Sequence, residues 1–152
     1  MNRPELRHLC EMHVKFALPM ELGDVPGGRR RIIPIIGGEV EGERLSGRIL
    51  DPGADLQTVH ADGTTELHAR HSIRTHDGAL IDFRNFGFRH GPPEVMARLA
   101  RGEDVDPSQY YMRTHPRFET GDGRYSWLNR MICVGTGGRH RDHVRISVFE
   151  VI

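Results

Sequence analysis

The chain has 152 residues, a length that fits one domain with a single hydrophobic core, so we treat residues 1–152 as one unit. Its 21 basic residues balance its 21 acidic residues, so no net charge favours nucleic acid or an anionic membrane as a partner. Charged residues interrupt the start of the chain, where a secretory segment would need a continuous apolar run. We therefore expect a soluble, cytoplasmic protein with neither a nucleic-acid nor a membrane partner.

Turn signals divide the chain at short intervals. Glycine next to aspartate or to another glycine supplies the positive φ of tight hairpin turns, and such pairs recur at Gly27-Gly28, Gly37-Gly38, Asp62-Gly63, Asp77-Gly78, Asp122-Gly123 and Gly137-Gly138. Segments of strand length lie between them, at residues 6–16, 30–36, 44–50, 55–60, 64–75, 79–88, 108–114, 124–136 and 143–152. This spacing predicts an all-β, antiparallel fold and not alternating strands and helices.

One stretch, residues 91–108, has a different pattern. Pro92 and Pro93 stand where a helix begins, apolar residues follow at helical spacing, and Gly102 stands where a helix ends. We expect one short helix here, which would cover the sheet or cross over it.

The strand at residues 64–75 suggests how the sheet is arranged. One of its faces carries His68, Arg70 and other polar groups, and the opposite face carries apolar residues together with His71. Residues 124–136 are half apolar on both faces, as in a barrel whose outside is partly covered. We predict an antiparallel β-barrel of about 8–10 strands with one short helix, and a two-sheet sandwich is the alternative.

Three stretches carry a resemblance to a known family. The segments GADLQTVHADGTTELHARHSIRTHDGALIDFRNFGFRHG and YYMRTHPRFETGDGRYSWLNR and the later GTGGR resemble the domain of unknown function 3237, also termed UPF0311, over nearly the whole chain. The resemblance implies a soluble antiparallel β-barrel with a central cavity and assigns no activity. The matching positions include Gly53, Asp55, Gln57, Asp62, Gly63, Arg70, Asp77, Gly78, Asn85, Gly87, Tyr111, Arg113, Phe118, Glu119, Trp127, Leu128 and Asn129. The chain departs from the family pattern at Leu56, His68 and His71, so a relative's substrate is not carried over.

An aromatic and polar segment supplies the first candidates for a pocket. Tyr111 and Arg113 share one face of an expected strand, and Trp127 and Asn129 share a face of the strand one hairpin away. If both faces point inward, they form an apolar pocket with a few orienting polar groups. The alternative is structural: Arg113 pairs with Glu119, and Trp127 fills the core.

Three further polar residues are candidates for ligand binding. Arg70 lies in the middle of a strand, on a face that is either the wet exterior or the cavity wall. Asn85 also lies in mid-strand, where asparagine is disfavoured and is often kept for a specific hydrogen bond. Gln57 is a candidate through its match to the family.

The sequence contains no metal or cofactor signature. The ten histidines form no HxH pair and no HExxH motif, so we expect no metal. No nucleophile elbow and no phosphate-binding lysine loop is present, so we expect no cofactor. Cys10 and Cys133 lack metal-type spacing, and we interpret both as reduced, buried thiols.

These residues favour acid–base chemistry without a cofactor on a small organic molecule, as in an isomerase or a lyase. Arg113 or Arg70 would stabilise a carboxylate or a developing oxyanion, and Glu119 or His68 would move the proton. A carrier or sensor that returns its ligand unchanged is the second hypothesis. The third is an assembly protein whose aromatic faces meet another subunit, and we expect a homo-oligomer in any case.

Overall fold

The computed structural model describes all residues, 1–152. In chain order its elements are β1 (Leu6–Phe16), β2 (Met20–Val25), β3 (Gly28–Glu41), β4 (Gly47–Ile49), β5 (Gly53–Val59), β6 (Thr65–Thr75), β7 (Leu80–His90), α1 (Pro93–Ala100), the 3-10 helix η1 (Pro107–Gln109), β8 (Tyr111–Glu119), the 3-10 helix η2 (Gly123–Arg130), β9 (Cys133–Arg139) and β10 (His143–Val151). The short α-helix predicted between residues 91 and 108 is therefore present as α1.

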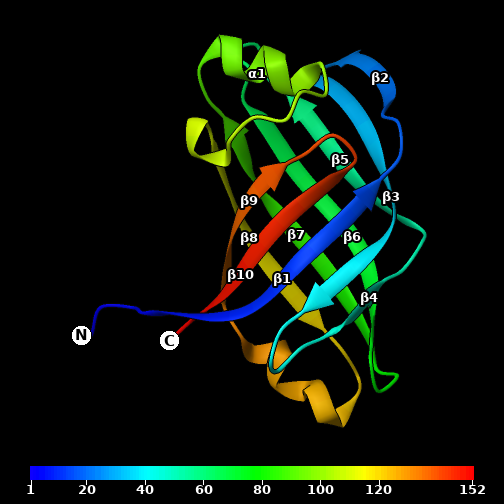
Figure 1. The fold of residues 1–152 in the computed structure, drawn as a ribbon, viewed down its shortest axis with the longest axis vertical. Helices are drawn as coiled ribbons and strands as arrows, with labels where there is room; N and C mark the ends of the chain where they lie inside the picture. Colours follow the sequence, from blue (N-terminus) through cyan, green and yellow to red (C-terminus); the bar gives the residue numbers. More distant parts are fainter.

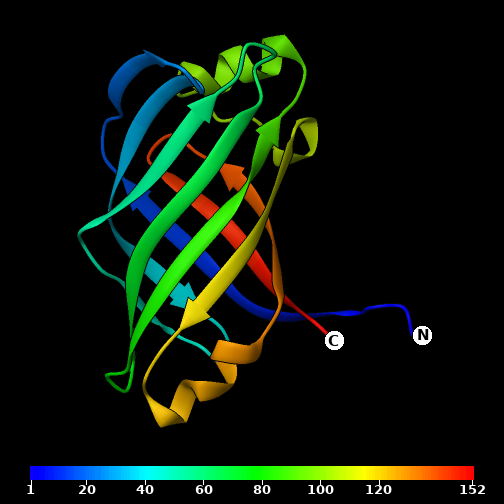
Figure 2. The ribbon, with the colours of Figure 1, turned by 180° about the vertical axis from the view of Figure 1, so that it is seen from behind.

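The strands form one antiparallel sheet that closes on itself, because β1 pairs with β10 on one side and with β3 on the other. From β10 the wall continues through β9, β8, β7 and β6, and it reaches β3 through β4 and β5, which pair with different stretches of that strand. β2 pairs with β3 alone. Figures 1 and 2 show the closed wall from opposite sides, with α1 at one end and η2 at the other. The predicted antiparallel barrel is confirmed, and the sandwich alternative is wrong.

The first and last strands are neighbours along their whole length. Leu6 pairs with Val151 at one end of this ladder, and Lys15 pairs with His143 at the other. Beyond the strand ends, the backbones of Glu5 and Ile152 exchange two hydrogen bonds, with N···O distances of 2.8 and 2.9 Å. The two ends of the chain therefore lie close together on one side of the barrel (Figure 1).

Gly37-Gly38 is not the hairpin turn that its sequence suggests, because both residues lie within β3. Their φ angles of 144° and 140° are in the region that favours glycine. A Cβ on Gly38 would collide with the backbone oxygen of His13 on β1. The pair thus gives β3 a bend and allows β1 to approach it closely enough to close the barrel.

Strand alternation separates the inside of the barrel from the outside. On β6 the buried side is Leu67, His71 and Ile73, whereas Arg70 and Arg74 are exposed. The other long strands alternate in the same way, with a buried residue at every second position of β7 and β8. Most charged side chains therefore belong to the outer face, and the few that point inward are informative.

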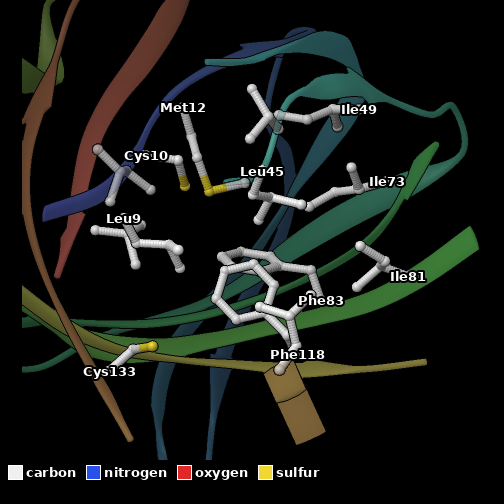
Figure 3. Close-up of a cluster of buried hydrophobic side chains, with 14 of the residues drawn as sticks. Leu9, Cys10, Met12, Leu45, Ile49, Ile73, Ile81, Phe83, Phe118 and Cys133 are labelled. Atoms are coloured by element: carbon white, nitrogen blue, oxygen red, sulfur yellow. The ribbon is translucent and has the colours of Figure 1, made fainter. Parts of the chain in front are cut away.

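The half of the barrel near η2 is filled by the main hydrophobic core. Eighteen buried residues form this cluster, most of them from the strands and η2 and two, Leu45 and Ala79, from loops. Phe83 and Phe118 lie near its centre with ring centroids 5.0 Å apart (Figure 3). Cys10 and Cys133 belong to it as free, buried thiols, as the sequence predicted. Burial raises the pKa of Cys10 to about 12 and that of Cys133 to about 11, so both thiols are unreactive near neutral pH.

The other half is closed by α1. Val95 and Leu99 of this helix pack with Leu67 of β6 and Met112 of β8 in a smaller, separate cluster. None of the helices is long and apolar enough to cross a membrane, and α1 has only eight residues. The barrel is thus densely packed at the η2 end and covered by a short helix at the other.

The structure corrects the prediction of a strand over residues 124–136. That stretch begins as the helix η2 and becomes a strand only at Cys133, where β9 starts. Asp122, expected in a hairpin turn, instead caps η2 by accepting a hydrogen bond from the Arg124 backbone N at 2.9 Å. Residues 110–130 are therefore one strand followed by a helix, and not two paired strands.

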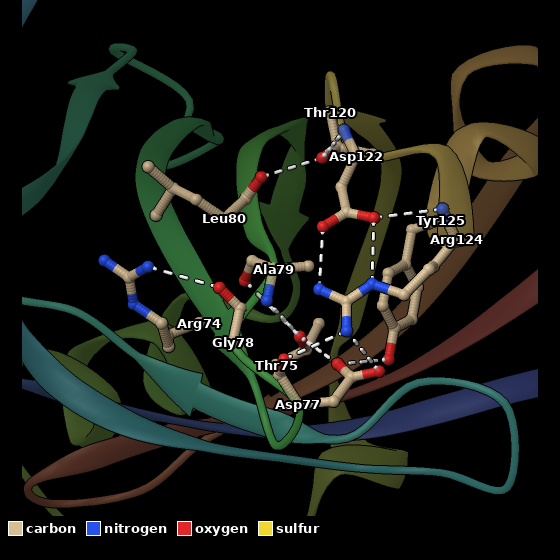
Figure 4. Close-up of polar contacts among 10 residues, drawn as sticks. All are labelled: Arg74, Thr75, Asp77, Gly78, Ala79, Leu80, Thr120, Asp122, Arg124 and Tyr125. Carbon is tan, nitrogen blue, oxygen red and sulfur yellow. Dashed lines mark hydrogen bonds and ion pairs between the residues drawn. The ribbon is translucent and has the colours of Figure 1, made fainter.

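A polar network attaches η2 to the turn between β6 and β7 (Figure 4). The Arg124 guanidinium forms ion pairs with Asp122 at 2.8 Å and with Asp77 at 3.2 Å. The Tyr125 hydroxyl donates to the Asp77 carboxylate at 2.9 Å, and the Thr75 hydroxyl donates to the same oxygen at 2.6 Å. Asp77 is thus the point where the barrel wall and η2 are joined.

Candidate functional site

The barrel contains a cavity of about 50 Å³ in the half next to α1. A water molecule needs roughly 10–15 Å³ of such space, so the cavity has room for about three to five waters or one compact organic molecule. Its apolar lining consists of Val14, Phe16, Ile33, Ile35, Leu67, Ala69, Phe83, Met112, Val144 and Ile146. Its polar lining consists of Asp55, Gln57, His71, Asn85, Arg89, Thr114 and Arg139. An apolar wall with a few converging polar groups is the usual composition of a small-molecule site.

One small residue, Ala69, leaves open space between the polar groups. Asp55 on β5 pairs with Ala69 on β6, which in turn pairs with Asn85 on β7, so the carboxylate and the amide flank an alanine. Gly87, between Asn85 and Arg89 on β7, adds no such space, because β8 fills the position that a side chain would take there. The polar groups therefore surround the part of the wall that Ala69 leaves open.

Several polar atoms of this cavity have no hydrogen-bond partner. They are Nδ1 of His71, Oδ1 of Asn85, Nε of Arg89 and Oγ1 of Thr114, four of the five such buried atoms in the protein. Buried polar groups are normally paired, and each unpaired group costs about 1–3 kcal/mol. Their concentration in one cavity indicates a place prepared for a polar ligand or ordered water.

Arg89 is the most unusual of these groups, because only 2% of its surface is exposed. Burial lowers the pKa of its guanidinium to about 10, and repulsion from Arg139 and Arg31 acts in the same direction. Asp55 attracts it without a hydrogen bond. Since the pKa stays far above neutral, the site holds a buried cation whose charge is poorly compensated.

Arg139 adds a second positive charge to the same cavity. Its Nη1 donates to the backbone oxygen of Leu99 in α1 at 3.0 Å, and its guanidinium carbon lies 5.7 Å from the ring centroid of Phe16. Burial lowers the pKa of Arg139, which remains a cation. Two arginines against one carboxylate, Asp55, give the cavity an excess of positive charge.

Asp55 is held by a chain of hydrogen bonds that begins outside the cavity. Arg31 donates from Nε to Oε1 of Gln57 at 2.8 Å, and Gln57 donates from Nε2 to Oδ2 of Asp55 at 2.7 Å. The backbone N of His68 donates to Oδ1 of Asp55 at 2.7 Å. Burial raises the pKa of Asp55 in spite of these bonds, each of which lowers it. The carboxylate is therefore fixed in orientation and more basic than an exposed aspartate.

His71 faces the cavity as a neutral ring. It stacks on Phe83 with centroids 4.6 Å apart, and burial lowers its pKa to about 4. A neutral imidazole can donate one hydrogen bond and accept another, but it adds no charge at neutral pH.

The structure brings only two of the sequence-predicted site residues into this cavity, namely Gln57 and Asn85. On β8 the inward positions are Met112, Thr114 and Phe118, so the expectation that Tyr111 and Arg113 face the interior is wrong. The aromatic and charged face of β8, which the pocket hypothesis required to be the inner one, is the outer face.

The remaining predicted residues have partners outside the cavity. Arg70 forms an ion pair with Asp82 at 3.1 Å on the outer face, and His68 is exposed beside Phe86. Glu119 forms ion pairs with Arg84 and Arg117, at 2.9 and 3.1 Å, and not with Arg113.

Arg113, Trp127 and Asn129 also have structural partners. The Arg113 guanidinium donates to its neighbour's backbone oxygen, at 2.9 Å, and lies over the ring of Tyr111. Trp127 lies on η2, with the Arg44 guanidinium carbon 5.0 Å from its ring centroid. Asn129 exchanges two hydrogen bonds with the Thr120 backbone. Catalytic or binding roles for these outer residues stay predictions from the sequence.

Sequence reasoning missed Arg89, Asp55, Arg139 and Thr114 as site residues. A signal was present for Arg89, because it continues the inward series of Ile81, Phe83 and Asn85 at every second position. His71 carried a similar signal as the single histidine on the apolar face of its strand. An inward charge in an apolar series is a better indicator of a cavity group than a cluster of polar residues.

Comparisons with known proteins agree with this fold. The profile of a family described as "Protein of unknown function (DUF3237)" matches residues 4–151. The UPF0311 protein RPA1785 of Rhodopseudomonas palustris is 48% identical over 148 residues, covering 97% of both chains. The UPF0311 protein blr7842 of Bradyrhizobium diazoefficiens is 45% identical over 143 residues, covering 90% of this chain and 93% of the relative.

Solved structures are similar over the full length. The crystal structure of RPA1785 superposes with a TM-score of 0.97 and 41% identity over 100% of both chains. A β-barrel-like protein from Acinetobacter baumannii gives a TM-score of 0.88 and 40% identity over 100% of this chain and 98% of the other. An enzyme from Penicillium herquei, at 19% identity and a TM-score of 0.75 over 100% of this chain and 97% of the other, shares the fold alone.

Proposed function

Starting from the fact that this chain belongs to the DUF3237 family of proteins of unknown function, we propose that its barrel cavity binds a small organic carboxylate. The observation that carries the proposal is Arg89, a buried cation with an unpaired Nε that lines the cavity. A buried charge without a partner destabilises a protein, and a bound anion would remove that cost.

The rest of the lining fits such a ligand. Arg139 adds a second cation, and Asn85 and Thr114 offer unpaired polar atoms to oxygen atoms of the ligand. The ten apolar residues would contact its hydrocarbon part. The small volume favours a compact acid and excludes a large cofactor.

The test is isothermal titration calorimetry with four carboxylates: but-3-enoate, 2-oxobutanoate, phenylpyruvate and benzoate. But-3-enamide and benzamide are the matched uncharged compounds, because they keep the shape and lose the negative charge. We expect at least one carboxylate to bind, and its amide to bind about 10- to 100-fold more weakly, since hydrogen bonds to charged groups contribute about 1.5–3 kcal/mol.

Arg89→Met should weaken carboxylate binding by a similar factor, because methionine fills the space of the stem without the charge. Arg48→Met is the matched control, since Arg48 is exposed on β4. Equal binding of acid and amide, an equal loss in the Arg48 variant, or no binding of any of the four acids would contradict the proposal.

A carrier and an enzyme would share this site. Both hypotheses predict the same binding data, and they differ in whether the ligand is returned unchanged. The cavity itself contains a group that bears on this choice.

A further inference from the structure

We propose that Asp55 is the general base of a proton shift within the bound carboxylate, an inference that rests on the anion site proposed above. The acid–base residues expected from the sequence, Glu119 and His68, lie outside the cavity. Asp55 is the only carboxylate among the residues that line it. A proton acceptor and a cationic anchor therefore share one enclosed space.

The strand register places Asp55 on one side of the open part of the wall and the polar groups of β7 on the other. Asp55 and Asn85 are separated by one strand, which places their backbones about 10 Å apart. The residue between them is Ala69, whose methyl group leaves that gap free. A compact acid held by Arg89 and Asn85 would thus have its carbon chain over Ala69, facing Asp55.

The hydrogen bonds around Asp55 orient it and favour its ionised form against the effect of burial. Because Arg31 can only donate, it fixes the Gln57 carbonyl toward itself, and the Gln57 amide nitrogen must donate to Asp55. With the bond from the His68 backbone, two of roughly four acceptor positions on the carboxylate are used. The other positions are available to a substrate. Gln57 is then a positioning residue for the base and not a direct ligand.

The proton shift needs no co-reactant. The Asp55 carboxylate removes a proton from a carbon activated by a neighbouring carbonyl group or double bond. The electron pair of that C–H bond forms the new C=C bond of an enolate, whose negative oxygen faces Arg89 and the hydroxyl of Thr114. The protonated Asp55 then returns the proton to the same carbon, which gives exchange alone, to the enolate oxygen, which gives the enol, or to the far carbon of a conjugated system, which gives the conjugated isomer. Each outcome restores the base.

This chemistry defines the substrate class as 2-oxo carboxylates and β,γ-unsaturated carboxylates. Each has a carboxylate for Arg89 and an acidified C–H within one or two bonds of it. The product is the enol or the conjugated isomer, so the reaction is an isomerisation without a cofactor.

The experiment follows deuterium incorporation by ¹H NMR in D₂O. The purified protein is mixed with 2-oxobutanoate, phenylpyruvate or but-3-enoate, and the loss of each activated C–H signal is timed. Binding of the same compounds is measured in the same samples by the shift in melting temperature. We expect the wild-type protein and the Arg48→Met control to accelerate exchange of at least one bound compound.

Asp55→Asn should lower the exchange rate about 100-fold or more and leave the thermal shift in place, because an amide cannot accept the proton. Arg89→Met should lose both signals. If wild-type protein binds a compound and accelerates exchange of none, Asp55 is not the base and the anion site stands. If no compound binds, the anion site itself is wrong.

A second variant covers the case in which Asp55→Asn does not fold. The NH2 group of the asparagine would face another donor, either the Gln57 amide nitrogen or the His68 backbone N. Gln57→Met removes one hydrogen bond to the carboxylate and should therefore raise the pKa of Asp55. As the pH is lowered, the exchange rate of this variant should then begin to fall at a higher pH than that of the wild type. The other ionisable groups around Asp55 are Arg31 from β3, His71 from β6, Arg89 from β7 and Arg139 from β9. An unchanged pH profile would show that the titrating base is not Asp55.

Discussion

At the scale of single residues, the cavity keeps a charge where a hydrocarbon side chain would be more stable. Arg89 lies among Leu67, Met112 and other apolar groups, and its Nε has no partner. An enclosed cation of this kind destabilises the protein, and the anion that we propose would remove that cost. The same residue should therefore have opposite effects on stability and on binding.

Arg89→Met should raise the free energy of unfolding of the unliganded protein by about 1 kcal/mol or more, because it removes a desolvated charge without creating a void. Urea denaturation measures this, with Arg48→Met as the exposed control expected to change little. A less stable Arg89 variant would mean that the guanidinium is already compensated within the protein.

His71 should make stability depend on pH. Its pKa is about 4 in the folded protein, against 6.5 for an unperturbed histidine, so the unfolded chain binds a proton that the folded one does not. Stability should therefore fall as the pH drops from about 6.5 to about 4, by about 3 kcal/mol in total.

His71→Phe keeps a ring against Phe83 and removes the titration. The difference in unfolding free energy between the two proteins should shift over this pH interval and stay constant above pH 7. The carboxylates titrate in both proteins, so their contribution to the pH dependence cancels in this difference. Parallel curves for wild type and variant between pH 4 and 6.5 would show that the folded-state pKa is not lowered.

The residue types of the site could be predicted from the sequence better than its location. Gln57 and Asn85, two of the predicted binding residues, line the cavity, whereas Arg113 and Tyr111 lie on the outer face of β8, although the pocket hypothesis required them to point inward. This strand has aromatic and charged residues on one face and Met112, Thr114 and Phe118 on the other, so its pattern does not show which face points inward. Pairing with the neighbouring strands decides this, and the sequence of one segment does not contain that information.

At the scale of secondary-structure elements, η2 closes the densely packed end through a few polar contacts. The Tyr125 hydroxyl reaches Asp77 in the turn between β6 and β7, and its ring lies in the main core. The attachment therefore combines burial with one hydrogen bond to a charged group.

Tyr125→Phe removes that hydrogen bond and keeps the ring. We expect the free energy of unfolding to fall by about 1 kcal/mol and carboxylate binding to stay the same, because the cavity is at the opposite end. Thermal denaturation and calorimetry measure the two effects, and Tyr111→Phe on the exposed face of β8 is the stability control. A loss of binding would mean that the two ends of the barrel are coupled.

Local turn signals predicted most strands but failed at three places, one of them Gly137-Gly138, which lies within β9. Asp122-Gly123 resembles a hairpin turn, yet the aspartate caps a helix, and the two roles use the same side-chain chemistry. Gly37-Gly38 lies in the middle of β3 because the strand must bend there, and β2 (Met20–Val25) was missed altogether. These choices depend on tertiary contacts that short-range patterns do not contain.

At the scale of the whole molecule, the all-β class followed from the regular spacing of turns, which depends on every strand, so a few wrong boundaries did not change it. The barrel was predicted partly from residues 124–136, which are half apolar on both faces. Most of that segment is the helix η2, so the barrel is confirmed although this part of its argument is wrong. The cavity could not be predicted in the same way, because it depends on Ala69 lying between Asp55 and Asn85 on the two neighbouring strands.

The pairing of β1 with β10 also sets an order of events during synthesis. β10 leaves the ribosome after every other strand, so the edge of β1 that it covers and the edge of β9 stay unpaired until residues 143–151 have been made. Contacts between segments this far apart in the chain form slowly, and open strand edges invite pairing with other chains. The nascent barrel is therefore most vulnerable to aggregation in the interval before its final strand appears.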